Sequence, residues 1–64
     1  MAKREAVETW VRDDSTGEYY FAGYYTVEPG RVLRRRQGFV YVKSPTSGEV
    51  FRYNAKDYAR ALER

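Results

Sequence analysis

The chain has 64 residues, of which 17% are aromatic and 33% charged, and its formal net charge is +3. It contains no Cys and no His, so disulfides and thiolate metal sites are excluded, and the commonest general base and nitrogen metal ligand are missing. A domain of this size has a thin core and little room for a deep pocket. We expect one domain over residues 1–64 that is not an enzyme and has no metal, cofactor or small-molecule substrate.

Hydropathy and composition give a first expectation about location. No apolar run approaches the ~20 residues of a membrane-spanning helix, and the opening stretch "MAKREAVE" lacks the apolar centre of a signal peptide. We expect a cytoplasmic protein without membrane contact. Few amides and many Arg and Glu residues are typical of thermophiles, and a thermophile is the source we expect.

The positive charge is concentrated in the middle of the chain. Residues 1–30 contain three basic and six acidic residues, whereas residues 31–43 contain five basic residues and no acid. A local basic cluster favours a polyanionic partner. Charge along a strand edge also prevents unwanted strand pairing. Both interpretations stay open until the charges are placed on a fold.

The first element expected along the chain is a hairpin within "WVRDDSTGEYY", residues 10–20. Strand-forming residues flank a four-residue connection that ends in Gly17, where a positive φ is needed. This loop length sets two pairs: Val11 with Tyr20 and Trp10 with Phe21. Both faces of the hairpin are apolar, so alternation does not indicate which one faces the core.

The second strand is predicted from about Glu18 to Val27. Gly23 lies inside it, and a Gly within a strand often marks a bend or bulge. The stretch "EPGR" that follows predicts a type II turn with Pro29 and Gly30 at its central positions.

Two further hairpins are predicted in the second half of the chain. Gln37-Gly38 closes one between strands 32–36 and 39–43, and "YVKSPTSGEVF", residues 41–51, repeats the pattern of the first hairpin. Alternation then sorts the side chains onto two faces. The predicted core face holds Leu33, Arg35, Val40, Val42, Phe51 and Tyr53. The opposite face holds Val32, Arg34, Arg36, Phe39, Tyr41, Lys43, Val50 and Arg52.

A C-terminal helix is predicted at about residues 55–63. Asn54 is a good N-cap and Asp57 complements the helix dipole. The predicted apolar stripe consists of Ala55, Tyr58, Ala59 and Leu62, and the predicted basic ridge of Lys56, Arg60 and Arg64. The expected fold is mostly β: a small SH3-like barrel of five antiparallel strands in a meander, followed by this helix.

The face opposite the core mixes four cations with aromatic and aliphatic side chains. Guanidinium groups bind phosphates and enter minor grooves, apolar side chains wedge between base steps, and aromatic rings stack on unpaired bases. This mixture suits a nucleic-acid surface better than a solvated edge or a second core. A peptide groove remains an alternative, because small barrels also bind peptides through surface aromatics.

The segment "KSPTSGEVFRYNAKDY", residues 43–58, resembles the last hairpin of the small SH3-like chromatin proteins of crenarchaea. The resemblance implies minor-groove DNA binding without sequence specificity, with an apolar wedge that bends the duplex. By position it matches four groove-facing residues: Phe39, Tyr41, Val50 and Arg52. The wedge would be Val32 or Leu33, and alternation favours Val32.

The resulting hypothesis is a monomeric, sequence-nonspecific double-stranded DNA-binding protein associated with the chromosome or nucleoid. Its predicted DNA-binding residues are Val32, Leu33, Arg34, Arg36, Phe39, Tyr41, Lys43, Val50 and Arg52. One alternative is a protein–protein interaction module or regulator that binds its partner through surface aromatics. Another is a three-strand-plus-helix domain like those at integrase N-termini, which would read the major groove.

Overall fold

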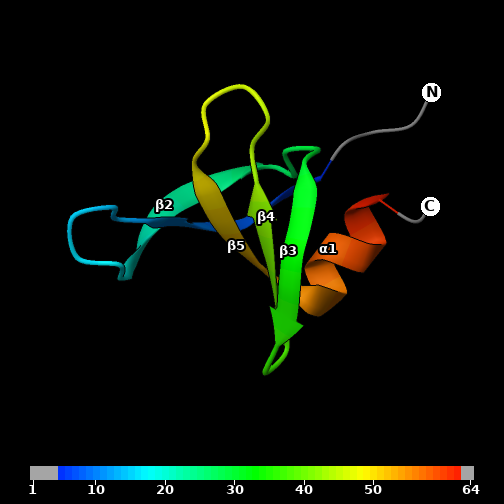
Figure 1. The fold of residues 1–64 in the computed structure, drawn as a ribbon. Helices are drawn as coiled ribbons and strands as arrows, with labels where there is room; N and C mark the ends of the chain where they lie inside the picture. The colour runs from blue at the N-terminus through cyan, green and yellow to red at the C-terminus, as the bar shows by residue number, and fades with distance from the viewer. Residues whose placement is uncertain (1–4, 63–64) are drawn as a thin grey trace.

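The computed structural model describes residues 5–62, which form five β-strands and one helix (Figure 1). In chain order the elements are β1 (Ala6–Arg12), β2 (Tyr19–Thr26), β3 (Arg31–Arg36), β4 (Phe39–Lys43), β5 (Val50–Asn54) and α1 (Ala55–Leu62). This confirms the mostly β fold class with five antiparallel strands and a C-terminal helix. Across residues 5–62, no helix is long and apolar enough to cross a membrane.

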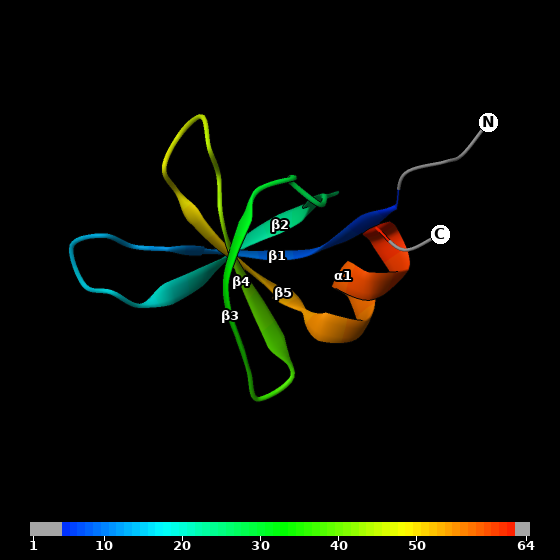
Figure 2. The same ribbon diagram turned by 45° about the vertical axis from the view of Figure 1, so that its right-hand side comes forward.

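The strands form one sheet in the order β2-β1-β5-β4-β3. The two halves join where β1 pairs with β5, through Trp10–Arg52 and Val11–Phe51. Figure 2 shows the β1–β2 ribbon crossing the direction of β3, β4 and β5. Because β2 and β3 are the two edges, the sheet is not closed. The predicted barrel is therefore present only in a loose sense, and the strand order departs from a simple meander.

The hairpin connections have the predicted geometry. Gly17 and Gly48 both have positive φ values, +79° and +77°. The first loop is also held by Asp13, whose carboxylate accepts hydrogen bonds from the Ser15 amide at 2.9 Å and hydroxyl at 2.7 Å. Most of the predicted pairs form: Trp10–Phe21, Val11–Tyr20, Arg34–Tyr41, Arg36–Phe39, Val40–Tyr53, Tyr41–Arg52, Val42–Phe51 and Lys43–Val50. One predicted pair is wrong, because Lys43 lies opposite Arg31 and not opposite Val32.

Gly23 lies next to a bulge in β2, as predicted. The register shifts so that Thr9 pairs with Gly23 and Trp10 with Phe21, which leaves Ala22 without an opposite residue. Gly23 has a φ of +130°, a conformation that side chains with a Cβ rarely adopt. The bend required in this long strand is therefore built from one unpaired residue and one glycine.

The predicted type II turn at residues 28–31 does not form. Such a turn needs a positive φ at its third residue, and Gly30 is not among the residues with positive φ. Gly30 is needed for a different reason, since an added Cβ would overlap the carbonyl oxygen of Lys43 and touch Val42. This tight contact with β4 could not be seen in the local sequence.

The predicted positions of Val32 and Leu33 are reversed. Val32 pairs with Val42 and packs against the core, while Leu33 has no opposite residue and is 46% exposed. The cause is a bulge in β3 between Val32 and Arg34. Strict alternation assumes a regular strand, and one extra residue shifts the phase of the side chains before it.

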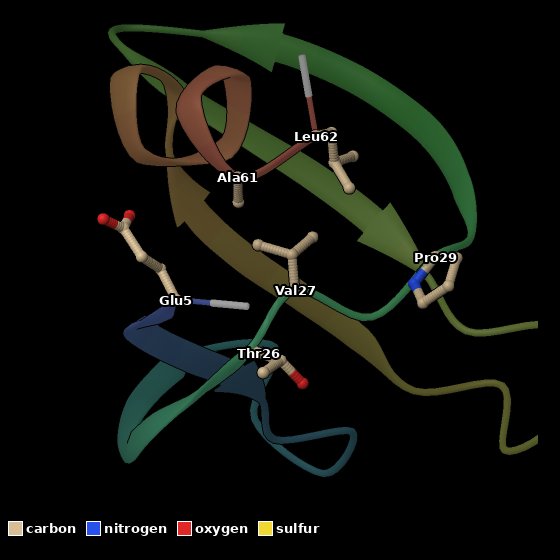
Figure 3. Close-up of a pocket in the computed structure, with 6 residues that line it drawn as sticks. All are labelled: Glu5, Thr26, Val27, Pro29, Ala61 and Leu62. Atoms are coloured by element: carbon tan, nitrogen blue, oxygen red, sulfur yellow. The ribbon is translucent and has the colours of Figure 1, made fainter. Parts of the chain in front are cut away.

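The core consists of Val7, Val27, Val40, Val42 and Tyr53, and α1 covers it with Ala55, Tyr58 and Ala61. Asn54 caps the helix as predicted, because its side-chain oxygen accepts bonds from the amides of Lys56 at 2.9 Å and Asp57 at 3.3 Å. Leu62, predicted to face the core, is 48% exposed. It borders a small cavity of about 170 Å³ beside Val27 (Figure 3).

The predicted basic ridge on the helix is altered by ion pairs. Arg60 bonds to Glu5 at 2.8 Å and to Asp57 at 3.0 Å, and the bond to Glu5 raises the pKa of this guanidinium. Arg64 lies outside the described residues. Arg60 therefore ties the helix to the segment before β1, and it offers less free charge than the sequence predicts.

Candidate nucleic-acid interface

The sheet face opposite the core gathers most of the predicted binding residues. Residues that pair directly across antiparallel strands point to the same face, and Arg52 pairs with Tyr41, which pairs with Arg34. By the same pairing rule this face includes Arg34, Arg36, Phe39, Tyr41, Lys43, Val50 and Arg52. Of the nine predicted residues, Val32 packs into the core instead, and Leu33 lies exposed at the bulge. Val50 pairs with Lys43 but is only 3% exposed, so it is buried and, contrary to the prediction, offers little surface to a ligand. We call this surface the basic–aromatic face.

Arg52 lies at the centre of the basic–aromatic face, among aromatic rings. Its guanidinium carbon is 4.5 Å from the ring centre of Phe39, 4.8 Å from that of Trp10 and 5.5 Å from that of Tyr19. Its Nε is buried and has no hydrogen-bond partner within the described chain. A buried donor without an acceptor is uncommon in native proteins and calls for a functional or structural explanation.

Tyr41 connects the two halves of the sheet on this face. Arg34 lies 5.1 Å from the centre of its ring on one side, and the ring of Tyr19 contacts it at 5.4 Å. Tyr19 belongs to β2 and Tyr41 to β4, although β1 and β5 lie between those strands. The twisted sheet therefore curves toward this face. Burial raises the pKa of the Tyr19 hydroxyl above its ordinary value.

The face continues over β1 and β2 as an aromatic surface that the sequence alone did not place. Trp10 contacts Phe21 at 5.6 Å, and Phe21 contacts Tyr24 at 5.7 Å, both edge to face. Phe21 is 46% exposed and Tyr24 65%. We call Trp10, Phe21 and Tyr24 the aromatic half of the face, and the surface over β3, β4 and β5 its basic half.

A signal for the aromatic half was present in β1. Val7, Thr9 and Val11 alternate along the strand and are all buried. Trp10 falls on the other face, between the charged residues Glu8 and Arg12. Two charges at this spacing indicate the solvent side of the strand, and they could have placed Trp10 there.

The cations of the basic half are not neutralised within the described residues. Ion pairs there link Arg12 to Asp14, and Arg60 to Glu5 and Asp57. None involves Arg34, Arg36, Lys43 or Arg52. Arg35 belongs to the core side, where its guanidinium lies 5.8 Å from the ring centre of Tyr58 on α1.

Comparison of the chain with protein-family models, with curated proteins and with solved structures finds no match. The resemblance of residues 43–58 to crenarchaeal chromatin proteins is thus neither supported nor contradicted. Within residues 5–62, no three acidic side chains gather to hold a metal ion. The basic–aromatic face is therefore the feature of the chain that bears most directly on its function.

Proposed function

We propose that the chain binds double-stranded DNA without sequence specificity, as a monomeric chromatin or nucleoid protein, through the basic half of the basic–aromatic face. The observation that supports this most directly is the environment of the Arg52 guanidinium group. It is a partly buried cation held among three rings, with no carboxylate paired to it in the described residues. A DNA phosphate would supply the negative charge that Arg52 lacks among the described residues.

The proposed lack of sequence specificity follows from the scarcity of amide side chains that could read base edges. Adenine is typically read in the major groove by Asn or Gln. The chain has one of each. Asn54 caps α1, and Gln37 lies in the β3–β4 turn with a φ of +53°. Arginines on a sheet face suit a minor groove, where shape and charge dominate over base identity.

The bulge in β3 changes which residue would act as the wedge. Val32 is committed to the core, whereas Leu33 is exposed beside Arg34. An exposed apolar side chain next to a phosphate-binding arginine can enter a base step while the arginine holds the backbone. Leu33 is therefore the proposed wedge, in place of the Val32 that alternation favours.

The proposal is tested by the affinity for a labelled random 20-base-pair duplex at 50 and 200 mM salt, measured by fluorescence anisotropy. Arg34→Glu is compared with Lys56→Glu, a matched charge reversal on the helix. We expect Arg34→Glu to weaken binding at least tenfold and to lower the salt slope by about one unit. Lys56→Glu should change the affinity less than threefold. Equal effects of both variants, or no binding at 50 mM salt, would rule out the proposed face.

A second candidate function, a protein-interaction module, is favoured by a groove on the opposite face of the sheet. This groove of about 380 Å³ is lined by Val11, Ala22, Tyr25, Phe51 and Tyr53, with Glu28 at its border. Tyr25 is 56% exposed. Apolar grooves of this kind bind peptide side chains. Capture of a partner after nuclease treatment, with loss on Tyr25→Ala and retention on Arg34→Glu, would favour this function over DNA binding.

A further inference from the structure

We infer that the aromatic half of the face binds unpaired bases, so that the preferred ligand is a DNA duplex carrying a single-stranded overhang. This inference rests on the proposed duplex binding and deepens it by naming the DNA structure. It is carried by the exposure, charge and position of the rings on β1 and β2.

The exposed rings are not explained by the core. Phe21 and Tyr24 lie on β2, an edge strand of the sheet, and both have large exposed areas. Their contacts are edge to face, with interplanar angles of 62° for Trp10–Phe21 and 78° for Phe21–Tyr24. In this arrangement the rings do not bury one another's faces as a stacked pair would. Flat aromatic surface thus remains open to a ligand.

The charge pattern separates the two halves chemically. β2 contains no charged residue from Tyr19 to Thr26. On β1 the same face has Glu8 opposite Tyr24, and Arg12, which is paired with Asp14 at 3.3 Å. The aromatic half therefore lacks the unpaired cations that a phosphate backbone requires. Aromatic side chains bind bases by stacking, at about 1–3 kcal/mol per base, and they do so with little regard to sequence. In an intact duplex the base faces are already stacked. Only unpaired bases can occupy this surface.

The position of the rings places them within reach of a bound duplex. The three rings that surround Arg52 come from both halves of the sheet: Trp10 from β1, Tyr19 from β2 and Phe39 from β4. The contact between Tyr19 and Tyr41 shows that the sheet curves and brings the halves together. Five strands spaced about 4.8 Å apart span roughly 20 Å. One ligand can therefore lay its duplex on the basic half and its overhang on the aromatic half.

The experiment compares a blunt 16-base-pair duplex with the same duplex carrying a six-thymine overhang, in anisotropy titrations at 100 mM salt. We expect the overhang to tighten binding at least fivefold. Phe21→Ala combined with Tyr24→Ala should remove this gain while it changes blunt-duplex affinity less than twofold. The matched control is Tyr20→Ala combined with Tyr25→Ala, which removes two rings from the same strand on the other face. It should keep the gain.

The possible outcomes separate the inference from the proposed function. Blunt-duplex binding with no gain from the overhang, or a gain that survives Phe21→Ala with Tyr24→Ala, overturns the inference and leaves duplex binding intact. No binding of the blunt duplex overturns the proposed function itself. If the double variant melts early, Tyr24→Ala alone, at the more exposed ring, replaces it. Trp10, the only tryptophan, gives a second readout, because its fluorescence should change more with the overhang than with the blunt duplex.

Discussion

Arg52 is held among aromatic rings with little net benefit to folding. A buried donor left without an acceptor costs about 1–3 kcal/mol. Each cation–π contact returns about 0.5–1 kcal/mol or more, and Arg52 makes three. These opposing contributions nearly cancel. The net stabilisation from the charge should therefore be small, while its attraction for an anion is retained.

Replacing Arg52 with Met should separate stability from binding. The unbranched Met side chain can pack among Trp10, Tyr19 and Phe39 without a buried donor. We expect Arg52→Met to leave the melting temperature within a few degrees of the original and to weaken duplex binding at least tenfold. Circular dichroism melting and anisotropy measure the two effects. A large loss of stability with unchanged affinity would make Arg52 a structural residue.

Val32 and Leu33 are neighbours with opposite predicted roles in the folded protein. Val32→Ala removes two methyl groups that contact the core and should cost about 1–3 kcal/mol in urea denaturation. Leu33→Ala removes exposed atoms and should cost less than about 0.5 kcal/mol. In contrast, Leu33→Ala should reduce the bend of a bound duplex, measured by energy transfer between labelled ends. An unchanged bend would exclude Leu33 as the wedge.

Tyr53 predicts how stability depends on alkaline pH. Its side chain is 1% exposed, and its hydroxyl oxygen accepts a hydrogen bond from the Glu28 amide at 3.1 Å. Burial raises its pKa above the unfolded value of 10.0. A raised pKa means that the stabilisation is complete below pH 10 and is lost as pH rises through the folded pKa. Tyr53→Phe should lower stability at pH 7 and reduce the loss between pH 9 and 11, as measured by urea denaturation.

At the scale of elements, the hairpins were predictable because their signals are local. The loops ending in Gly17 and Gly48 contain the residues that shape them, so loop length and register follow from a few positions. The helix cap is local too, because the side-chain oxygen of Asn54 accepts a hydrogen bond from the amide of Lys56 at the start of α1. The Gly23 bulge was visible because a glycine interrupts a strand pattern.

The features that were not predictable depend on contacts between elements. Nothing in "RVLRRR" (residues 31–36) marks the bulge at Leu33, since no glycine accompanies it. Gly30 is needed because β4 approaches it, and not because of its own φ. The basic half of the face could be derived from alternation in β4 and β5. The charges of Glu8 and Arg12 could have placed Trp10 on the solvent side of β1. That the aromatic half lies beside the basic half depends on the pairing of β1 with β5, which joins distant parts of the chain.

Gly30 and Gly17 allow a comparison of two reasons for a glycine: a close approach by another strand at Gly30 and a positive φ at Gly17. Gly17→Ala places a Cβ in open space but keeps a positive φ, a strain of about 1–2 kcal/mol. Gly30→Ala drives a Cβ into the Lys43 carbonyl and should displace β3 from β4. We expect the larger loss of stability at Gly30, by urea denaturation. A smaller loss there than at Gly17 would contradict the close approach.

At the scale of the whole molecule, a core cluster of four valines and one tyrosine, covered by one helix, must hold an open sheet together. Domains of this size without disulfides or metals are only marginally stable. A ligand that binds only the folded state adds about 2.7 kcal/mol at 100 times its Kd. For a domain of about 60 residues, that corresponds to a rise in melting temperature of roughly 10–20 °C.

A saturating short duplex should therefore raise the melting temperature by this amount at 50 mM salt. The shift should shrink as salt increases, because the binding is expected to be electrostatic. Differential scanning calorimetry with a duplex that melts at higher temperature than the protein measures it. A saturated complex without a shift would mean that the unfolded chain binds equally well, and that the charge alone, without the folded face, accounts for affinity.

The bulge at Leu33 also affects how this chain should be compared across evolution. It amounts to one extra codon inside a strand, in a place where insertions are seldom expected. A relative without the bulge would be one residue shorter between Arg31 and Gln37. An alignment without a gap would then be wrong by one residue on one side of the bulge. On that side it would match core positions of one chain to surface positions of the other. Residues 6–32 and 34–62 are therefore best compared as two separate blocks, each with its own phase.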